Sequence, residues 1–181
     1  PATRAPAVSL KVVDLGEKGC GVLVNRDVAA GEAVCDYVGE ILSKQEAAVR
    51  QSVYDDGVRL PGFAKPEPDR LALEGCNEVC GVYHADSTAA AAAGSGARRG
   101  MNYLLVLLEH LPTRTVRTSV DPTHFGGVAA CINHSCAPNL IPTVVRDGSI
   151  VPTVRLVASV QIIAGSEITF DYGDLYDGTE V

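Results

Sequence analysis

Side chains with polar or nucleophilic groups are densest in the segment Ala130-Cys131-Ile132-Asn133-His134-Ser135-Cys136-Ala137-Pro138-Asn139 of this 181-residue chain. Strand-like residues flank it, at 103–108 and 117–120 before it and at 150–156 and 167–172 after it. A nucleophilic pair of His134 and Cys136 is one hypothesis, although residues two apart seldom face each other. A structural histidine is the alternative. The flanking pattern predicts a mostly β core around this segment.

The β pattern also fills residues 8–42. Hydrophobic residues alternate at 8, 10 and 12, Gly19-Cys20-Gly21 interrupts the chain, and hydrophobic residues resume at 22–24. A turn at 29–32 then leads into a strand at 33–38. Short strands joined by glycine turns predict several small sheets.

Residues 43–101 have a different composition. Ser43 and Glu46 have capping-box spacing, which predicts a helix from 44 to about 53. Prolines follow at 61, 66 and 68, and residues 87–100 form a low-complexity run. We expect one domain over residues 1–181: an N-terminal part at 8–43, an irregular, partly helical insertion at 44–101 with a flexible loop at 87–100, and a C-terminal part at 102–176.

A weak internal repeat, or echo, links the N-terminal and C-terminal parts. Ala30-Gly31 leads through a strand to Asp36-Tyr37, and Ala164-Gly165 leads through a strand to Asp171-Tyr172. The ordinary residue preferences of β-turns explain this repeat as well as a shared functional role does. If the role is shared, the two strand ends bring tyrosine hydroxyls to one site.

The net charge of −7 argues against direct nucleic-acid binding, because an acidic surface repels phosphate backbones. Such a surface suits a basic polypeptide better. Hydrophobic residues make up 46% of the chain, which is enough for a core. However, no apolar run approaches the about 20 residues of a membrane span. The chain begins with Pro-Ala-Thr and shows no signal peptide, so an intracellular protein, excised or processed at this end, is the default expectation.

The six cysteines, at 20, 35, 76, 80, 131 and 136, are expected to be reduced thiols. Cys76, Cys80 and His84 have a spacing that would put them on one helical face, where they could bind a metal. Glycines at 75 and 81 weaken such a helix. Ordinary thiols are the favoured interpretation, and we expect no metal site.

Four motifs then occur in an order that matches a known family. They are Gly19-Cys20-Gly21, Tyr37-Val38-Gly39-Glu40, Asn133-His134-Ser135-Cys136 with Pro138-Asn139, and Glu167-Ile168-Thr169-Phe170-Asp171-Tyr172-Gly173. With the insertion between the second and third, they resemble the SET domain of protein lysine methyltransferases over about residues 10–176. Residues 120–139 and Tyr103-Leu104-Leu105 most resemble the heterochromatin-type branch that methylates lysine 9 of histone H3.

The resemblance implies a mostly β fold, with small sheets around a C-terminal pseudoknot. It also implies methyl transfer from S-adenosylmethionine, which leaves S-adenosylhomocysteine, to a lysine of the histone H3 tail or another basic peptide. The expected location is the nucleus, on chromatin. A non-histone substrate and a catalytically silent SET fold that binds a peptide are the alternatives.

Methyl transfer to an amine is an in-line displacement, which needs a neutral, aligned lysine away from bulk water. Tyrosine suits such a channel, because it combines an apolar face with an uncharged hydroxyl. By resemblance, Tyr172 and Tyr37 are the catalytic residues and bind the substrate lysine together with Phe170, and Tyr103 lies by the methyl donor. A phenylalanine at 170 implies di- or trimethylation. Half-buried sheet tyrosines and a plain core phenylalanine are the alternatives.

The resemblance assigns the cofactor to Gly19, Cys20, Gly21, Asn133 and His134 as well as to Tyr103. The two glycines let the backbone approach the methionine part of the cofactor closely. Asn133 and His134 would bind its amino and adenine groups. The family usually has an aromatic residue where Cys20 stands, and a plain hairpin turn is the alternative for this segment.

The sequence departs from many relatives in its cysteines. Many relatives carry a cysteine-rich zinc module before the domain or after it. In the module after the domain, a cysteine equivalent to Cys136 is a zinc ligand. The printed sequence has no cysteine after Cys136, so we do not expect zinc there. The branch also usually has Arg-Phe where this chain has Ala130-Cys131.

Overall fold

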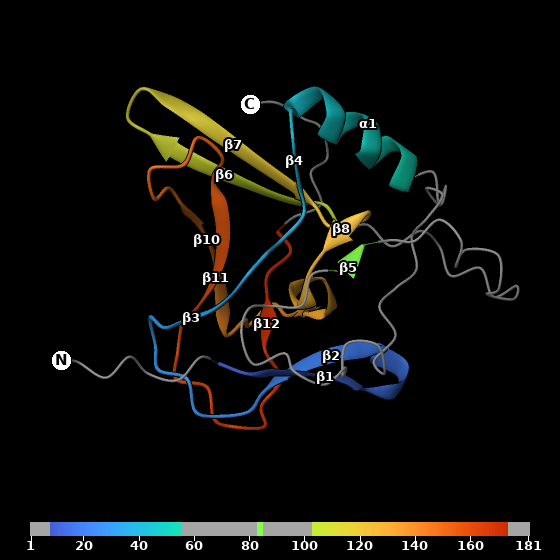
Figure 1. The fold of residues 1–181 in the computed structure, drawn as a ribbon, viewed down its shortest axis with the longest axis vertical. Helices are drawn as coiled ribbons and strands as arrows, with labels where there is room; N and C mark the ends of the chain where they lie inside the picture. Colours follow the sequence, from blue (N-terminus) through green and yellow to red (C-terminus); the bar gives the residue numbers. More distant parts are fainter. Residues whose placement is uncertain (1–7, 56–82, 85–102, 174–181) are drawn as a thin grey trace, which may run out of the picture.

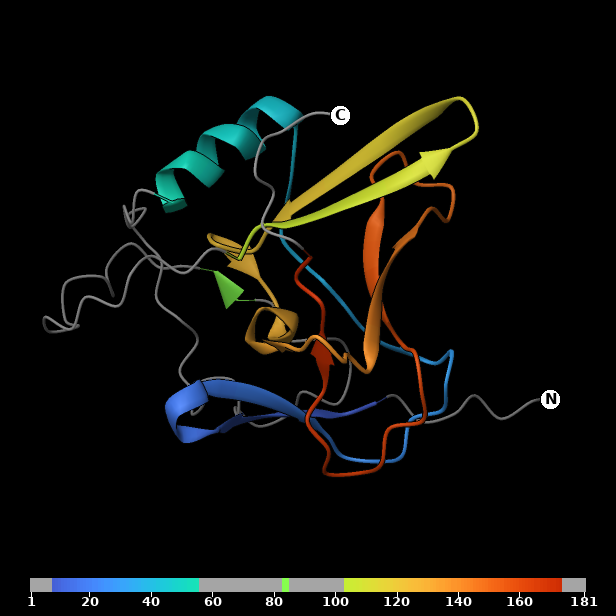
Figure 2. The ribbon, with the colours of Figure 1, turned by 180° about the vertical axis from the view of Figure 1, so that it is seen from behind.

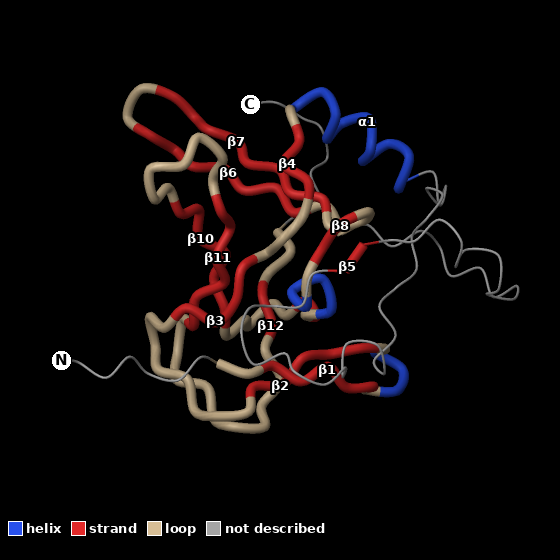
Figure 3. Tube along the Cα trace, in the orientation of Figure 1, coloured by secondary structure: helices blue, strands red, loops and turns tan. Residues whose placement is uncertain are grey.

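Short strands make up most of the structure, a computed structural model that describes residues 8–55, 83–84 and 103–173 (Figures 1 and 3). The strands are β1 (Leu10–Asp14), β2 (Cys20–Val24), β3 (Ala33–Asp36), β4 (Glu40–Leu42), β5 (Tyr83–His84), β6 (Leu105–Leu111), β7 (Arg114–Asp121), β8 (Phe125–Gly126), β9 (Asn133–His134), β10 (Leu140–Val145), β11 (Thr153–Ala158) and β12 (Thr169–Phe170). With them are the helix α1 (Lys44–Asp55) and the 3-10 turns η1 (Gly16–Lys18) and η3 (Val128–Cys131). This composition confirms the mostly β fold.

The described strands pair into small sheets, as the glycine turns predicted. Their orders are β1-β2, β3-β11-β10-β12-β9, β4-β7-β6 and β5-β8. The β1-β2 hairpin lies at one end of the molecule and the β6-β7 hairpin projects at the other, as both views show (Figures 1 and 2). The five-stranded sheet connects these ends and contains the quoted Asn-His segment as β9.

The knot-like element is β12, which runs parallel to both of its neighbours. Phe170 pairs with His134 of β9 on one side and with Leu140 of β10 on the other. The Asn139 side chain holds the strand in place, because its Oδ1 accepts from Thr169 N at 2.8 Å and its Nδ2 donates to Glu167 O at 2.9 Å. The C-terminal segment is therefore threaded against the loop after β9, which lies about 30 residues earlier in the chain.

The hydrophobic core lies where these sheets meet. Complete burial of a large aliphatic side chain contributes about 1.5–3 kcal/mol, so a few such residues dominate the folding energy. The residues with less than 2% exposure include Val22, Val24, Ile132, Leu140, Leu156 and Ile168. They come from both ends of the sequence, so the core forms only when the two parts of the chain come together.

The capping-box prediction is confirmed at the start of α1. Ser43 N donates to Glu46 Oε2 at 2.9 Å, and Glu46 N donates to Ser43 Oγ at 3.3 Å. The helix continues to Asp55, two residues beyond the expected end. No described helix has the length and apolar character needed to cross a membrane.

Two strand predictions need correction. The strand expected at 150–156 starts only at Thr153, because the preceding residues form a turn in which Ile150 is completely exposed. The strand expected at 167–172 is regular only at Thr169–Phe170. Strand β10 was not among the expected strands, and it contains Pro142, a residue that sheets accept only where no ladder bond is needed from its nitrogen. It is tolerated because β12 pairs with β10 only at Leu140, so no β12 ladder bond is required at Pro142.

Part of the insertion lies outside the described residues, including the loop at 87–100, Cys76 and Cys80. His84 belongs to strand β5, which pairs with β8, so the helix proposed to align it with the two cysteines is wrong at this position. A strand alternates its side chains between two faces and does not provide the helical spacing on which that hypothesis depended.

Candidate functional site

An aromatic cluster forms where the two echoing strand ends meet. The ring centroid of Phe170 lies 5.9 Å from that of Tyr37, in an edge-on contact, and 4.9 Å from that of Tyr172. The two turns upstream also pair with each other, through a bridge between Val28 and Ile162. The echo in the sequence therefore corresponds to two similar segments that bring one tyrosine each to Phe170.

Each tyrosine hydroxyl is fixed by a backbone carbonyl. Tyr37 OH donates to Tyr103 O at 2.7 Å, and Tyr172 OH donates to Ile132 O at 2.6 Å. Tyr37 is buried, and its own N donates to Val154 O at 2.7 Å. The structure thus brings Tyr37 and Tyr172 together around Phe170, and the backbone carbonyl of Tyr103 contacts Tyr37.

Tyr172 combines an accessible surface with an enclosed hydroxyl. The residue is 48% exposed, but its hydroxyl lies against the Ile132 carbonyl. Burial, with a smaller electrostatic contribution from Cys131, raises the pKa of Tyr172 to about 12. The phenol is therefore neutral at physiological pH and acts as a hydrogen-bonding group rather than as a base.

The Gly19-Cys20-Gly21 turn lies beside Asn133. Gly19 has a φ of 77°, a left-handed conformation that favours glycine. A Cβ on Gly21 would lie 3.1 Å from Asn133 Nδ2 and would collide with the Leu15 side chain. Cys20 itself is buried in the core. The absence of a side chain at 21 is thus what allows the turn and Asn133 to approach each other.

Glu167 is a polar residue of this region to which the sequence analysis gave no role. Its Oε1 accepts from Asn133 Nδ2 at 2.8 Å, and its Oε2 lies 3.5 Å from Lys18 Nζ. Glu167 stood within a quoted motif, but motif order alone does not reveal a contact with a residue 34 positions earlier. Among the described residues, Asn133 Oδ1 accepts no hydrogen bond and can receive one from a ligand.

His134 and Cys136 do face each other, which corrects the geometric expectation. Their Nε2 and Sγ atoms are 3.3 Å apart, because the chain bends after β9 and Ala137 N donates to Ser135 Oγ. Tyr172 N donates to His134 Nδ1 at 3.2 Å, so that nitrogen carries no proton and Asp171 Oδ1, 3.6 Å away, is not its ion-pair partner in this tautomer. The ring proton is then on Nε2, which donates toward the thiol, and the imidazole is not placed as a base for Cys136.

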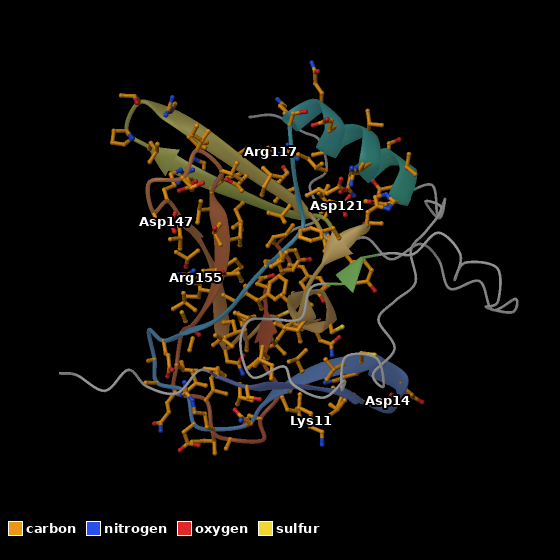
Figure 4. The ribbon with its side chains drawn as sticks, viewed as in Figure 1. Lys11, Asp14, Arg117, Asp121, Asp147 and Arg155 are labelled. Atoms are coloured by element: carbon orange, nitrogen blue, oxygen red, sulfur yellow. The ribbon has the colours of Figure 1, made fainter. Side chains whose placement is uncertain are left out.

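Sequence reasoning missed a buried polar network between α1 and the end of β7. Asp121, fully buried at the end of β7, accepts from Arg50 Nη1 at 2.5 Å and from Tyr54 OH at 2.7 Å, and Thr123 donates to it from both N and Oγ1. Arg50 also donates to Glu40 Oε2 at 2.6 Å. Asp121 lies under α1 in Figure 4. The positions of Arg50 and Tyr54, four apart on one helix, were the only signal available in the sequence.

The charges in this network are stabilised as ions. Burial alone would raise the pKa of Asp121, but hydrogen bonds from Thr123, Tyr54 and Arg50 outweigh it and hold that pKa below its ordinary value. Burial also raises the pKa of Tyr54, to about 12. Immediately next to the network, a Cβ on Gly39 would lie 2.7 Å from the backbone carbonyl of Asp121. The network therefore fixes strand β4, which begins at Glu40, three residues after Tyr37.

Comparison with known proteins gives a consistent result. The SET domain family matches residues 19–173. The chain is 30% identical to the histone-lysine N-methyltransferase SUVR3 of Arabidopsis thaliana over 176 residues, which cover 95% of this chain and 39% of that protein. It is 29% identical to the probable histone-lysine N-methyltransferase set-23 of Caenorhabditis briggsae over 164 residues, which cover 91% of this chain and 50% of that protein.

A solved structure agrees with the sequence matches. The methyltransferase domain of human histone-lysine N-methyltransferase SETMAR superposes with a TM-score of 0.59 at 25% identity, covering 94% of this chain and 46% of that one. The chain thus spans half or less of the length of these relatives. The parallel β12, the order of the four motifs and the family match over most of the sequence lead to one conclusion: the chain belongs to the SET-domain family.

Proposed function

We propose that this chain is an S-adenosylmethionine-dependent lysine N-methyltransferase that acts on a histone tail or another basic peptide. The observation that carries the proposal is the cluster of Tyr37, Phe170 and Tyr172 next to the Asn133-His134 strand. The cluster offers apolar ring faces and uncharged hydroxyls, which are the groups that can hold a lysine amine. Three relatives named as histone-lysine methyltransferases support the choice of substrate class.

The residues present fit the proposed cofactor. Asn133 Oδ1 is an acceptor that a cationic amino group can use, and Gly21 has no side chain to obstruct the approach. We assign Gly19, Cys20, Gly21, Asn133 and His134 to the cofactor, with Tyr103 beside its methyl group. When bound, S-adenosylmethionine supplies an activated methyl group. The backbone of the glycine turn and the side chain of Asn133 would bind and orient it.

The tyrosines orient the substrate. A lysine ammonium, with a reference pKa of about 10.4, has to lose its proton before it can accept a methyl group. Enclosure by the rings of Tyr37 and Tyr172 disfavours the charged form, because it removes water from the ammonium. The hydroxyl of Tyr172 has its proton directed to Ile132 O, so its lone pairs face the incoming amine as acceptors.

The finer assignments are part of the same proposal. A phenylalanine at 170 brings no hydroxyl to the cluster, which favours di- or trimethylation over monomethylation. We favour lysine 9 of histone H3 as the target and chromatin, in the nucleus, as the location. We propose a single SET domain over residues 1–181, with its two SET parts at 8–43 and 102–176 and with the insertion at 44–101 shaping the peptide groove.

The test compares two variants that each remove one tyrosine hydroxyl. Tyr172→Phe should lose most turnover on a histone H3 tail peptide, at least about tenfold, while S-adenosylmethionine binding measured by calorimetry is retained. Tyr54→Phe, which removes a buried hydroxyl outside the cluster, should keep its turnover. Equal turnover in Tyr172→Phe and the wild type would refute the role of Tyr172. Peptide binding without any transfer by the wild type would instead identify a silent binding module.

A further inference from the structure

Glu167 lies between the two segments that we assign to the cofactor. Its carboxylate accepts from Asn133 Nδ2 at 2.8 Å, and a Cβ on Gly21 would be 3.1 Å from Oε1. On its other side, Oε2 is 3.5 Å from Lys18 Nζ, in the turn that precedes Gly19. One carboxylate thus binds the asparagine and lies next to the glycine turn, and its side chain is only 22% exposed.

The backbone holds this carboxylate in place. Glu167 forms a β-bridge with Leu23, and its carbonyl accepts from Asn139 Nδ2 at 2.9 Å. The next residue, Ile168, donates from its N to Val22 O at 2.9 Å. Glu167 is therefore anchored to β2 on one side and to the loop after β9 on the other, so its side chain starts from a fixed point.

The contact with Glu167 decides which way the Asn133 amide points. An ionised carboxylate only accepts hydrogen bonds, so it can bind the amide through the NH2 group but not through the oxygen. The amide oxygen must then point to the other side. That oxygen is an acceptor, and a ligand with a cationic amino group is its natural partner.

We propose that Glu167 is a positioning residue for the cofactor, which locks the Asn133 amide with its oxygen toward the cofactor's amino group. The inference rests on the proposed function, because it presupposes that Asn133 binds S-adenosylmethionine. It also predicts a specificity: ligands that carry the amino group gain from Glu167, and ligands that lack it do not. Glu167 acts through Asn133 and does not itself touch the reacting atoms.

The key variant is Glu167→Gln, which keeps the shape of the side chain. A glutamine can donate as well as accept, so it binds either orientation of Asn133 and no longer selects one. We expect S-adenosylhomocysteine to bind about tenfold more weakly to Glu167→Gln than to the wild type, the size expected for one misplaced charge-assisted hydrogen bond. Glu109→Gln, which neutralises a surface carboxylate paired with Arg146, is the matched control and should bind normally.

A double-mutant cycle separates positioning from a general structural effect. In an Asn133→Ala background, Glu167→Gln should have no further effect on affinity, because no amide is left to orient. If Asn133→Ala binds too weakly to measure, S-adenosylhomocysteine without its amino group replaces the mutation and should bind wild type and Glu167→Gln equally. Thermal unfolding of each protein checks that it is folded.

The outcomes distinguish the two claims. An unchanged affinity in Glu167→Gln, or an equal loss in the Asn133→Ala background, would overturn the positioning role while the proposed function stands. A wild-type protein that binds neither S-adenosylmethionine nor S-adenosylhomocysteine would overturn the proposed function itself.

Discussion

Replacing Asp121 by asparagine should destabilise the protein by about 3 kcal/mol, the lower end of the range for breaking a buried ion pair. Asp121 is fully buried and accepts hydrogen bonds from Arg50, Tyr54 and Thr123. In asparagine, one of the two accepting oxygens becomes an NH2 donor that faces another donor. The lower end applies because Arg50 retains Glu40 at 2.6 Å.

Urea unfolding followed by circular dichroism measures this loss as a lower midpoint at an unchanged slope. A drop of about 6–12 °C in Tm should accompany it. Glu109→Gln is the control, since its pair with Arg146, at 2.6 Å, is nearly as short as the 2.5 Å pair of Asp121 with Arg50 but lies at the surface, where an ion pair contributes about 0–1 kcal/mol. If the two variants lose similar stability, burial of Asp121 does not have the importance we assign to it.

Repeating the unfolding experiment at acidic pH should show that the stabilisation from Asp121 decreases as the pH falls. The pKa of Asp121 is lower in the folded protein than its ordinary value, because its hydrogen bonds outweigh burial. The stability from this group is therefore present above the unfolded-state pKa of about 3.9 and is lost as the pH falls through the lower folded pKa. The difference in the free energy of unfolding between the wild type and Asp121→Asn should therefore become smaller over this range of falling pH.

Three further predictions concern other parts of the site and fold. Absorbance titration should detect tyrosines with a pKa of about 12, and Tyr54→Phe or Tyr172→Phe should each remove one of them. The folding stability that these neutral phenols contribute is lost as the pH rises from about 10 to 12. An ordinary pKa of about 10 would contradict their burial. Gly39→Ala should lower the free energy of unfolding in urea by about 1–3 kcal/mol and reduce peptide turnover, because its Cβ would lie 2.7 Å from backbone atoms of β7. A loss below 0.5 kcal/mol, roughly the level of a neutral surface change, would refute the clash. Ser43→Ala should cost about 1 kcal/mol in the same assay by removing the cap of α1, and no change would show that the capping box is not needed.

Local patterns in the sequence predicted local structure well. The capping box located the start of α1, the alternating residues at 8–12 located β1, and the hydrophobic run at 22–24 located β2. Both depend on contacts between residues close in sequence, which periodicity records. The motif order identified the family, which in turn supplied the pseudoknot that periodicity alone could not give.

The contacts that the sequence did not reveal are long-range or depend on local bends. Arg50 and Asp121 are 71 positions apart, and nothing in either neighbourhood marks them as partners. Strand β10 was not expected, and its pairing with β11 brings together residues up to 18 positions apart, Leu140 and Ala158. The approach of His134 to Cys136 required a bend that spacing alone does not indicate.

The most direct test of the account is mass spectrometry of histone H3 tail peptides incubated with the protein and S-adenosylmethionine. We predict mass gains in whole methyl units on a lysine, with two or three units on lysine 9. Their loss in Tyr172→Phe would connect the transfer to the aromatic cluster. If folded protein with bound S-adenosylmethionine adds no methyl group to histone peptides or to other lysine-containing protein substrates, the proposed activity is wrong.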